Sequence, residues 1–483
     1  MLKTSIHGVW SSGLLFVFAA VGSAIGLGNI WKFPYIAGEY GGGAFVLMYV
    51  VFVFLIGMPI MMAEIMLGRR GRQSPVNTMY TLAIEAGKSP AWQALGWMGM
   101  VAGFLILSYY SVVAGEVMAY SLRAISGAFT HQTPSGIRSI YSDFVSDPEN
   151  LLAWHTIFVV LTMVVVARGV REGLEKLVRI LMPLLFLLLI VLVGYGLNSE
   201  GFAEAVRFLF QPDFAKLIYT VNESGVRELT AKPILVAMGH SFFTLSLGMG
   251  AIMPYGAYLG RTVSISHATL SIVLLDTVVA LLAGLAIFPI VFTYQLDPAS
   301  GPGLIFQTLP LAFGAMPGGA FFGFLFFILL FFAAWSSAIS LIEPAIAWMV
   351  ERRAMTRVAA AAWAGAVVWL LGIASIFSAT GTTLRDILSI VLGWAGLETF
   401  GLRQPFFSLT FFEVVDFATA NIMLPLGGML TAIFVGWVMQ RESVRDEINV
   451  RHGDMCTLWM TLLKYVSPLA VFIIFLSVLG LIG

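Results

Sequence analysis

Two hydrophobic segments of this chain carry glycines and oxygen-bearing side chains at their middles, where an ordinary membrane-spanning helix is apolar throughout. The first break runs from Gly22 to Asn29, and the second runs from Ser246 to Gly250. Because an unpaired backbone N–H or C=O in hydrocarbon is costly, a spanning helix unwinds only where protein, water or a ligand replaces the lost partners. Two such breaks in corresponding halves of one chain predict a buried site for ions and a small solute.

The polar residues beside the two breaks indicate which kind of ion such a site would hold. Asn29 ends the first break, while Thr244 and Ser246 flank the start of the second. Backbone carbonyls together with neutral oxygen-bearing side chains suit a hard monovalent cation, which needs several oxygen ligands and tolerates little surplus negative charge. For the glycines taken alone, helix packing through Gly22-x-x-x-Gly26 is an equally good interpretation.

Further polar side chains lie inside later apolar segments. Asp276 is the strongest functional candidate, because an aspartate at the membrane centre costs roughly 2.5–3.5 kcal/mol and should therefore face a cavity and have a partner. Ser336 and Ser337 are weaker candidates, since serines in membrane helices commonly bond back to their own helix. We interpret Glu64 as structural, and His240 as a hydrogen-bonding neighbour of Asp276 rather than a proton carrier.

The composition restricts the chain to one broad class. Its 483 residues are 59% hydrophobic and only 11% charged, and many apolar runs are long enough to cross about 30 Å of hydrocarbon. A formal net charge of zero without any block of like charge gives no indication of nucleic-acid binding. The single Cys456 excludes an internal disulfide and a cysteine-based metal site. Since no nucleophile and base have convincing spacing, we expect neither an enzyme nor an organic cofactor.

We therefore predict an all-α polytopic membrane protein with eleven transmembrane helices. The predicted spans are 10–36, 42–68, 91–125, 152–169, 176–197, 232–259, 265–292, 319–350, 357–378, 412–439 and 459–481. Arginines fall in alternate loops, as the positive-inside rule requires for an inner (plasma) membrane protein with a cytoplasmic N-terminus. The region 379–411 is the least defined, because Ile387–Trp394 is too short to span and indicates an interfacial or re-entrant segment.

The order of the spans predicts an internal repeat. Spans one to five and six to ten form two blocks of five, an odd number, so the second block must enter the membrane in the opposite sense. The interrupted spans are the first of each block. We expect a single domain over 1–483, with inverted five-helix repeats at 8–197 and 232–440 and an extra C-terminal helix within 441–483.

Four segments resemble signature sequences of the neurotransmitter:sodium symporter family, and they lie at residues 26–34, 41–45, 241–250 and 331–337. The similarity extends from about residue 7 to the end of the tenth span, and the chain resembles the bacterial members that transport leucine or hydrophobic and aromatic amino acids. The resemblance implies a fold of two inverted five-helix repeats with discontinuous helices 1 and 6. It also implies cotransport of sodium with an amino acid or a related amine.

The resemblance further implies two sodium sites. The first would be formed by the substrate's own carboxylate together with the Ala24 carbonyl, Asn29, Thr244 and Asp276. The second would be formed by the carbonyls of Gly22, Ile25 and Ala333 and the hydroxyls of Ser336 and Ser337.

By the same resemblance, the substrate would lie between the two breaks. Its carboxylate would meet the Gly28 amide region and the Tyr110 hydroxyl, where a half-helix N-terminus favours an anion. Its ammonium would meet carbonyls near Ala24, Phe243, Thr244 and Ser246. Its side chain would contact Ser23, Ile106, Phe243, Met249 and Leu341, and Ser337 would also belong to this substrate site.

Two departures from the family pattern refine these expectations. Chloride-dependent members have asparagine at the Asp276 position and serine at the Ala280 position. A fixed carboxylate beside Tyr49 and His240 would supply the charge that chloride supplies elsewhere, so we expect transport without chloride. If Asp276 takes up a proton after sodium leaves, proton antiport would follow.

The second departure concerns the substrate. Monoamine-transporting members carry an aspartate at the Gly26 position, so the uncharged Gly26 favours substrates that bring their own carboxylate. Met249 is flexible and can repack around side chains of different shapes. We expect neutral hydrophobic L-amino acids, aromatic ones included. A neutral amine or indole-like solute is the alternative substrate, and a nontransporting amino-acid sensor would retain the same site.

Two gates follow from the resemblance. Lys32 and Asp416 would form the outer ionic gate, with lysine in place of the family's more common arginine. The cytoplasmic gate would be formed by Trp10, Tyr258 and Glu351. His7 stands near that gate where many relatives have arginine.

Overall fold

The computed structural model describes residues 5–221, 227–299, 301, 303–386, 408–448 and 453–478. Most of this part of the chain is helical. Besides 3₁₀ and π-helical turns, the helices are α1 (Gly13–Ala24), α2 (Phe33–Glu39), α3 (Gly43–Phe52), α4 (Met58–Gly71), α5 (Pro75–Glu85), α6 (Gln93–Ile125), α7 (Pro134–Val145), α8 (Pro148–Ala167), α9 (Lys176–Gly196), α10 (Phe202–Phe210), α11 (Phe214–Ile218), α12 (Lys232–Thr244), α13 (Ile252–Ala257), α14 (Ile265–Thr293), α15 (Leu309–Ala315), α16 (Gly319–Arg353), α17 (Arg357–Ala379), α19 (Phe411–Phe417), α20 (Leu424–Ile433), α21 (Arg441–Ile448), α22 (Gly453–Thr461) and α23 (Ser467–Val478).

The helices form a multi-pass membrane protein. Within the described residues, nine continuous helical segments are long and apolar enough to cross a membrane, and a bent pair makes a tenth. That pair is Gly13–Ala24 and Gly28–Glu39, which meet at 53°. The segments α12 and α13 are separated by residues 245–251 and form a second interrupted helix. Counted as one span, α12 and α13 bring the total into agreement with the eleven predicted spans.

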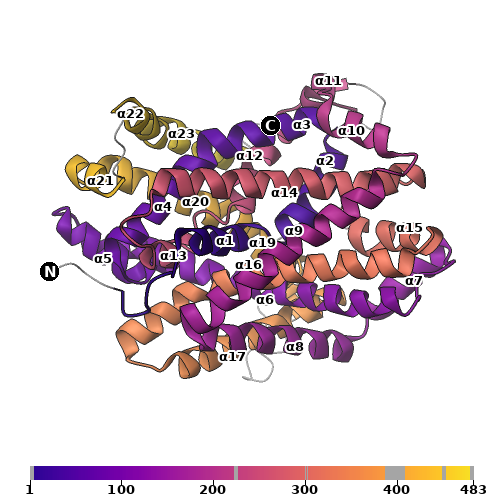
Figure 1. The fold of residues 1–483 in the computed structure, drawn as a ribbon, viewed down its shortest axis with the longest axis horizontal. Helices are drawn as coiled ribbons and strands as arrows, with labels where there is room; N and C mark the ends of the chain where they lie inside the picture. Colours follow the sequence, from indigo (N-terminus) through magenta and orange to yellow (C-terminus); the bar gives the residue numbers. More distant parts are fainter. Residues whose placement is uncertain are drawn as a thin grey trace.

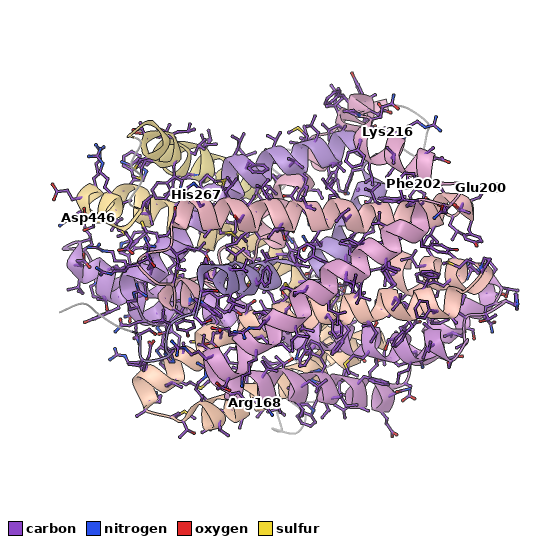
Figure 2. The ribbon with its side chains drawn as sticks, viewed as in Figure 1. Arg168, Glu200, Phe202, Lys216, His267 and Asp446 are labelled. Carbon is purple, nitrogen blue, oxygen red and sulfur yellow. The ribbon has the colours of Figure 1, made fainter. Side chains whose placement is uncertain are left out.

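The long helices run side by side and give the molecule two distinct ends (Figure 1). The end that carries the N-terminus, called here the N-terminal end, also holds α5, α13 and α21, while α7, α10 and α15 lie at the opposite end. Polar side chains mark both ends in Figure 2: His267 and Asp446 lie toward the N-terminal end, whereas Glu200 and Lys216 lie toward the opposite end. The two longest helices, α6 and α16, pack along one another through the middle of the bundle.

The first break separates α1 from a π-helical turn. After α1 ends at Ala24, Ile25 is extended with φ −68° and ψ 114°, and the chain resumes helical geometry in a turn over Gly28–Lys32. A helix end leaves carbonyls without intrahelical partners, and a helix start leaves N–H groups without them. The break therefore supplies both kinds of backbone group within a few residues of each other.

The second break depends on backbone conformations that favour glycine. Ser246, Gly248 and Gly250 have φ values of +53°, +81° and +67°. A Cβ on Gly248 would overlap the Leu424 carbonyl, so this segment packs directly against α20. The Glu64 carboxylate on α4 accepts a hydrogen bond from Gly248 N at 2.7 Å and so replaces a lost helical partner.

One short element departs from the all-α prediction. Between α11 and α12, the strands β1 (Tyr219–Val221) and β2 (Arg227–Leu229) pair antiparallel, with Tyr219 opposite Leu229. Strands of three residues are too short to show an alternating pattern in the sequence. The predicted interfacial segment Ile387–Trp394 lies outside the described residues.

Candidate functional site

Asp276 lies at the centre of a polar cluster between the two breaks. Its Oδ1 accepts a hydrogen bond from Asn29 Nδ2 at 2.8 Å, and its Oδ2 accepts one from the Thr244 hydroxyl at 3.1 Å. The Tyr49 hydroxyl lies 3.5 Å from Thr244 Oγ1, and all four side chains are fully buried. No ion pair among the described residues includes Asp276. Because a buried carboxylate is costly without a charged partner, this cluster favours a bound cation.

Four separate elements supply this cluster, namely the turn after the first break, α3, the last residue of α12, and α14. Asn29 connects the first break to α14. Its Oδ1 accepts a hydrogen bond from Gly26 N at 3.3 Å, while its Nδ2 also reaches the Asp276 carbonyl at 3.3 Å. Because an amide oxygen has two lone pairs, Asn29 Oδ1 can accept the bond from Gly26 and still ligate an ion.

Two residues of the predicted second sodium site, Gly22 and Ser336, meet where α1 packs against α16. A Cβ on Gly22 would lie 3.3 Å from Ser336 Cβ, so the two helices are in close contact here. The Ser336 hydroxyl donates to the carbonyls of Phe332 and Ala333, both at 3.1 Å, as serines in membrane helices commonly do. Met182 on α9 also contacts this point, 3.1 Å from the same Cβ position. The sequence analysis missed Met182, because nothing in an apolar span marks such a contact.

A small cavity of ≈ 20 Å³ lies between the breaks. Its walls contain most of the predicted substrate-site residues. They are Ala24, Gly28, Ile106, Tyr110, Phe243, Ser246, Met249, Ser337 and Leu341. The walls also include Gly26 and Leu27, which were not predicted as contacts. No charged side chain lines this cavity among the described residues.

Two predicted substrate residues, Ser23 and Thr244, do not line the cavity. Thr244 is committed to Asp276, as described above. The Ser23 carbonyl accepts a hydrogen bond from the Ser246 hydroxyl at 3.1 Å, which ties one break to the other. The Ser23 hydroxyl is buried and has no hydrogen-bond partner among the described residues.

Tyr110 and Phe243 separate the small cavity from a much larger one. Both residues line the small cavity and also a vestibule of ≈ 330 Å³ toward the opposite end. The Tyr110 hydroxyl accepts a hydrogen bond from Leu27 N at 3.3 Å. Tyr141 of α7 covers part of the vestibule, and burial, helped by the nearby Glu116, raises the pKa of its phenol above the ordinary value.

Lys32 and Asp416, the predicted outer gate, both line the vestibule but do not pair with each other in the part of the chain that the structure describes. The Lys32 ammonium lies 4.3 Å from the centroid of the Phe243 ring, an arrangement typical of a cation–π contact. Asp416 accepts a hydrogen bond from the Tyr109 hydroxyl at 3.2 Å. The vestibule between the two residues is therefore not bridged by an ion pair.

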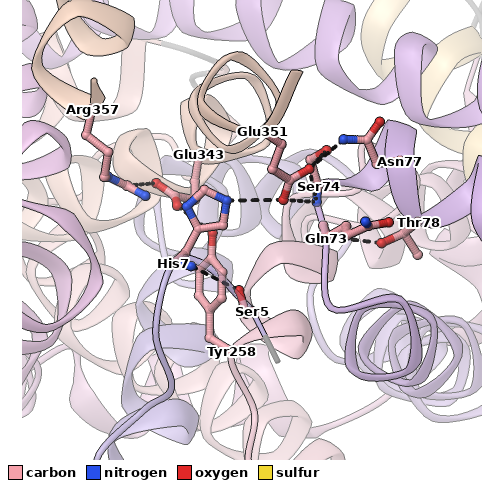
Figure 3. Close-up of polar contacts among 10 residues, drawn as sticks. All are labelled: Ser5, His7, Gln73, Ser74, Asn77, Thr78, Tyr258, Glu343, Glu351 and Arg357. Carbon is pink, nitrogen blue, oxygen red and sulfur yellow. Dashed lines mark hydrogen bonds and ion pairs between the residues drawn. The ribbon is translucent and has the colours of Figure 1, made fainter. Parts of the chain in front are cut away.

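The predicted inner gate lies in a closed polar network at the N-terminal end (Figure 3). His7 Nε2 lies 3.1 Å from Glu351 Oε1. The same carboxylate accepts hydrogen bonds from Ser74 N at 2.8 Å and 3.0 Å, from the Ser74 hydroxyl at 2.5 Å, and from Asn77 Nδ2 at 2.7 Å. Trp10 is held beside this network by two hydrogen bonds. Its indole N–H donates to the Tyr255 carbonyl and its backbone N–H donates to the Tyr258 carbonyl, both at 3.0 Å.

Tyr258 belongs to a neighbouring ion-pair cluster. Its hydroxyl donates to Glu343 Oε1 at 2.8 Å and not to Glu351, with which the sequence analysis had grouped it. Arg357 Nη2 donates to Glu343 Oε2 at 2.6 Å, and the Glu343 side chain is completely buried. Its partner Arg357 comes from the start of the next helix.

His240 occupies an aromatic pocket beside Asp276. Its ring stacks on Phe33 and Phe243, with centroids 6.1 Å and 6.4 Å away, and tilts against Tyr49 at 5.3 Å. Neither ring nitrogen has a hydrogen-bond partner among the described residues. The interpretation of His240 as a hydrogen-bonding residue is therefore wrong within the part of the chain that the structure describes.

Comparison with known proteins gives consistent results. The model of the sodium:neurotransmitter symporter family matches residues 7–143 and 142–397. YhdH of Bacillus subtilis, described as an uncharacterized sodium-dependent transporter, is 36% identical over 478 residues, which cover 98% of each chain. A sodium-dependent transporter of Haemophilus influenzae is 32% identical over 97% of each chain. The crystal structure of MhsT in complex with L-phenylalanine superimposes with a TM-score of 0.84 at 39% identity, covering 98% of this chain and 99% of MhsT.

Proposed function

Because the chain belongs to the sodium:neurotransmitter symporter family, we propose that it is a sodium-coupled symporter that imports neutral hydrophobic L-amino acids by alternating access. Aromatic amino acids are included. The observation that carries the proposal is the position of Asp276, which is fully buried between the two helix breaks and hydrogen-bonded to Asn29 and Thr244.

Two sodium ions would bind beside the breaks. The Asp276 carboxylate supplies the only full negative charge that the described protein offers to the first ion, and the neutral oxygens of Asn29, Thr244 and the Ala24 carbonyl would complete its ligands with the substrate carboxylate. The second ion would use the carbonyls of Gly22, Ile25 and Ala333 with the hydroxyls of Ser336 and Ser337. Because the substrate carboxylate would be a ligand of the first ion, binding of the substrate would be coupled to binding of sodium.

The substrate would occupy the small cavity between the breaks. Its carboxylate would meet the N–H groups near Gly28 and the Tyr110 hydroxyl, where the start of a helix favours an anion. Its side chain would lie against Ile106, Met249 and Leu341, which are apolar or only weakly polar. The absence of a charged wall among the described residues supports a neutral side chain. The bound L-phenylalanine of MhsT supports an aromatic one.

Alternating access would use the two ends of the molecule in turn. The unpaired Lys32 and Asp416 leave the vestibule open, whereas His7, Trp10 and Glu351 close the N-terminal end. This arrangement fits an outward-facing state, with the N-terminal end in the cytoplasm of an inner-membrane protein. The breaks after α1 and after α12 would then occupy equivalent positions in two inverted repeats, at 8–197 and 232–440. These repeats would belong to a single domain over 1–483, with an extra helix within 441–483.

Sodium coupling would supply ample driving force. At about 100 mV each inward charge gains about 2.3 kcal/mol, and a tenfold sodium gradient adds about 1.4 kcal/mol. Two ions therefore provide roughly 7 kcal/mol, enough to accumulate a neutral zwitterion by about five orders of magnitude at the limit. Transport would not need chloride, because Asp276 carries the required charge, and its protonation during the return step would add proton antiport.

Uptake into proteoliposomes tests this proposal directly. Purified protein should accumulate labelled phenylalanine, tryptophan, tyrosine or leucine when sodium is outside, and not when potassium replaces it. Omission of chloride should leave the rate unchanged. Sodium-dependent binding without uptake would instead indicate an amino-acid sensor. Stronger competition by a decarboxylated analogue than by the amino acid itself would favour the alternative amine substrate and overturn the proposed substrate class.

A further inference from the structure

An apolar groove runs along the outside of the bundle between α8 and α17. It has a volume of ≈ 380 Å³ and is lined by six residues between 156 and 167 of α8 and six between 358 and 369 of α17. Of these twelve described residues, only Thr156 and Trp369 have polar side chains. In a multi-pass membrane protein such a surface faces hydrocarbon, so an acyl chain is the natural occupant.

Small side chains on α17 create the groove. Ala362 and Ala366 are exposed, and a Cβ on Gly365 would lie 2.8 Å from Met163 Cγ, which shows how closely the two helices approach. Val160 on α8 and Trp363 on α17 project outward, with 54% and 65% of their surfaces exposed. The surface between them is therefore concave.

The groove has the length of one membrane leaflet. Its α8 wall covers eleven residue steps and is thus about 17 Å long at about 1.5 Å per residue. Half of a hydrocarbon core of about 30 Å is about 15 Å. At the end of the groove formed by Thr156 and Trp369, the Trp369 Nε1 donates a hydrogen bond to the Thr156 hydroxyl at 2.8 Å. The polar atoms of the two residues therefore bond to each other and do not need a partner from the lipid.

The other end of the groove is positively charged. Arg168 follows α8 and is exposed, and Figure 2 shows it on the outer edge of the bundle beside α8. Arg357 opens α17 and packs against Gly169, whose Cβ position lies 3.6 Å from Arg357 Cδ. Arg357 Nε donates to the Val166 carbonyl and Nη2 donates to Glu343, while Nη1 is buried and has no hydrogen-bond partner among the described residues, so Arg357 fixes the start of α17 against the end of α8.

Two further features strengthen this positive end. The helix α17 begins here, after its N-cap Thr356, and a helix start carries partial positive charge. The acidic residues close by in the sequence already have partners, since Glu343 pairs with Arg357 and Glu172 pairs with Lys176. Glu343 neutralises Arg357 inside the bundle, so the positive charge open to a phosphate at this end comes from the exposed Arg168 and from the start of α17.

We propose that this groove binds one acyl chain of an anionic phospholipid, with the phosphate beside the exposed Arg168, close to the start of α17. A second copy of the chain fits less well. Spread over its length, the groove has a cross-section on the order of 20 Å², whereas a helix with its side chains is on the order of 10 Å across. The proposal is independent of the transported substrate and of which end faces the cytoplasm.

Native mass spectrometry of the purified transporter, with phosphatidylglycerol and phosphatidylcholine of identical acyl chains, tests the site. The wild-type protein should retain phosphatidylglycerol at least fivefold better than phosphatidylcholine. Ala366→Trp, which fills the groove, should reduce this retention at least fivefold, while Leu187→Trp on the exposed face of α9 should not. Arg168→Gln should reduce the preference for phosphatidylglycerol at least threefold, while Arg138→Gln at the opposite end should leave it unchanged.

A second measurement needs no substitution. Phosphatidylglycerol with a photoreactive acyl chain should label peptides that contain residues 156–167 or 358–369 in the unmodified protein. Equal retention of the two lipids, full retention by Ala366→Trp, or labelling confined to other helices would each overturn the proposal. A dimer in the wild-type spectrum that Ala366→Trp dissociates, without any change in bound lipid, would show that a second copy occupies the groove instead.

Discussion

At the scale of single residues, Gly26 determines how much space lies between the breaks. A Cβ on Gly26 would lie 2.8 Å from the Tyr110 hydroxyl and 3.1 Å from Ser337 Oγ, so any side chain here would enter the cavity. The resemblance of the sequence to a family identified Gly26 as a position without charge. The sequence could not show that Gly26 forms part of the cavity wall, because the neighbouring Tyr110 and Ser337 come from distant helices.

Gly26→Ala should weaken substrate binding. Overpacking by one methyl group typically costs about 1–3 kcal/mol, which corresponds to a roughly 5- to 150-fold higher dissociation constant. Sodium-dependent binding of labelled phenylalanine would measure this change. Gly194→Ala on α9 is the matched control, because a Cβ there has no atom within 4 Å. Unchanged affinity in Gly26→Ala would place the substrate elsewhere.

Asp276→Asn should create a chloride requirement. The substitution removes the one full negative charge in the cluster but keeps the shape of the side chain, with one oxygen that can still accept a hydrogen bond from Asn29 or Thr244. Sodium-driven uptake by the variant should therefore fall at least tenfold in gluconate medium and recover in part when chloride is added. Asp386→Asn, at an exposed position outside the cluster, should behave as wild type in both media. Uptake by Asp276→Asn that is indifferent to chloride would contradict the proposed role of the carboxylate.

At the scale of elements, the two breaks were predictable because glycine and oxygen-bearing residues are rare at the middle of a membrane span. The partners of the breaks were harder to predict. Glu64 was interpreted as structural, and its bond to Gly248 N agrees with that interpretation. The bond between Tyr258 and Glu343 was missed, because the pairing depends on how the end of α13 meets α16, which no local pattern encodes.

Glu351→Ala should shift the transporter away from its closed N-terminal end. The change removes the acceptor for His7, Ser74 and Asn77 together, and charge-assisted hydrogen bonds contribute about 1.5–3 kcal/mol each when they are lost. A smaller outward-facing population lowers the apparent affinity for external substrate in proportion. Binding to outside-facing sites in oriented membranes should weaken at least fivefold.

The control for this change is Glu85→Ala, which removes a surface partner of Arg70 at the same end of the molecule. It should leave substrate binding unchanged. If both variants bind substrate as well as wild type does, the polar network around Glu351 is not part of the gate.

At the scale of the whole molecule, the Glu343 and Arg357 pair joins α16 to α17 inside the bundle. Glu343→Gln leaves the Arg357 guanidinium without its charged partner, and breaking a buried pair in this way typically costs about 3–5 kcal/mol. The thermal unfolding midpoint in detergent should fall clearly. Glu172→Gln, which affects an exposed pair with Lys176, should not change it. An unchanged midpoint for Glu343→Gln would show that the pair adds no net stability.

Hydropathy predicted nearly all of the spans, since each span must satisfy its own backbone in lipid. Tertiary contacts were less predictable. Lys32 and Asp416 are both present in the vestibule, but the contact of Lys32 with Phe243 depends on the open arrangement of helices. The short hairpin β1–β2 was missed because neither strand is long enough to carry a pattern.

The small size of the cavity between the breaks has a kinetic consequence. At ≈ 20 Å³ it has space for little more than one water molecule, far less than an aromatic amino acid requires. Entry of the solute must therefore await displacement of Phe243, Met249 or their neighbours. Association that waits for such a rearrangement is slower than diffusional encounter. Rapid-mixing experiments should accordingly show an observed rate that levels off at high solute concentration.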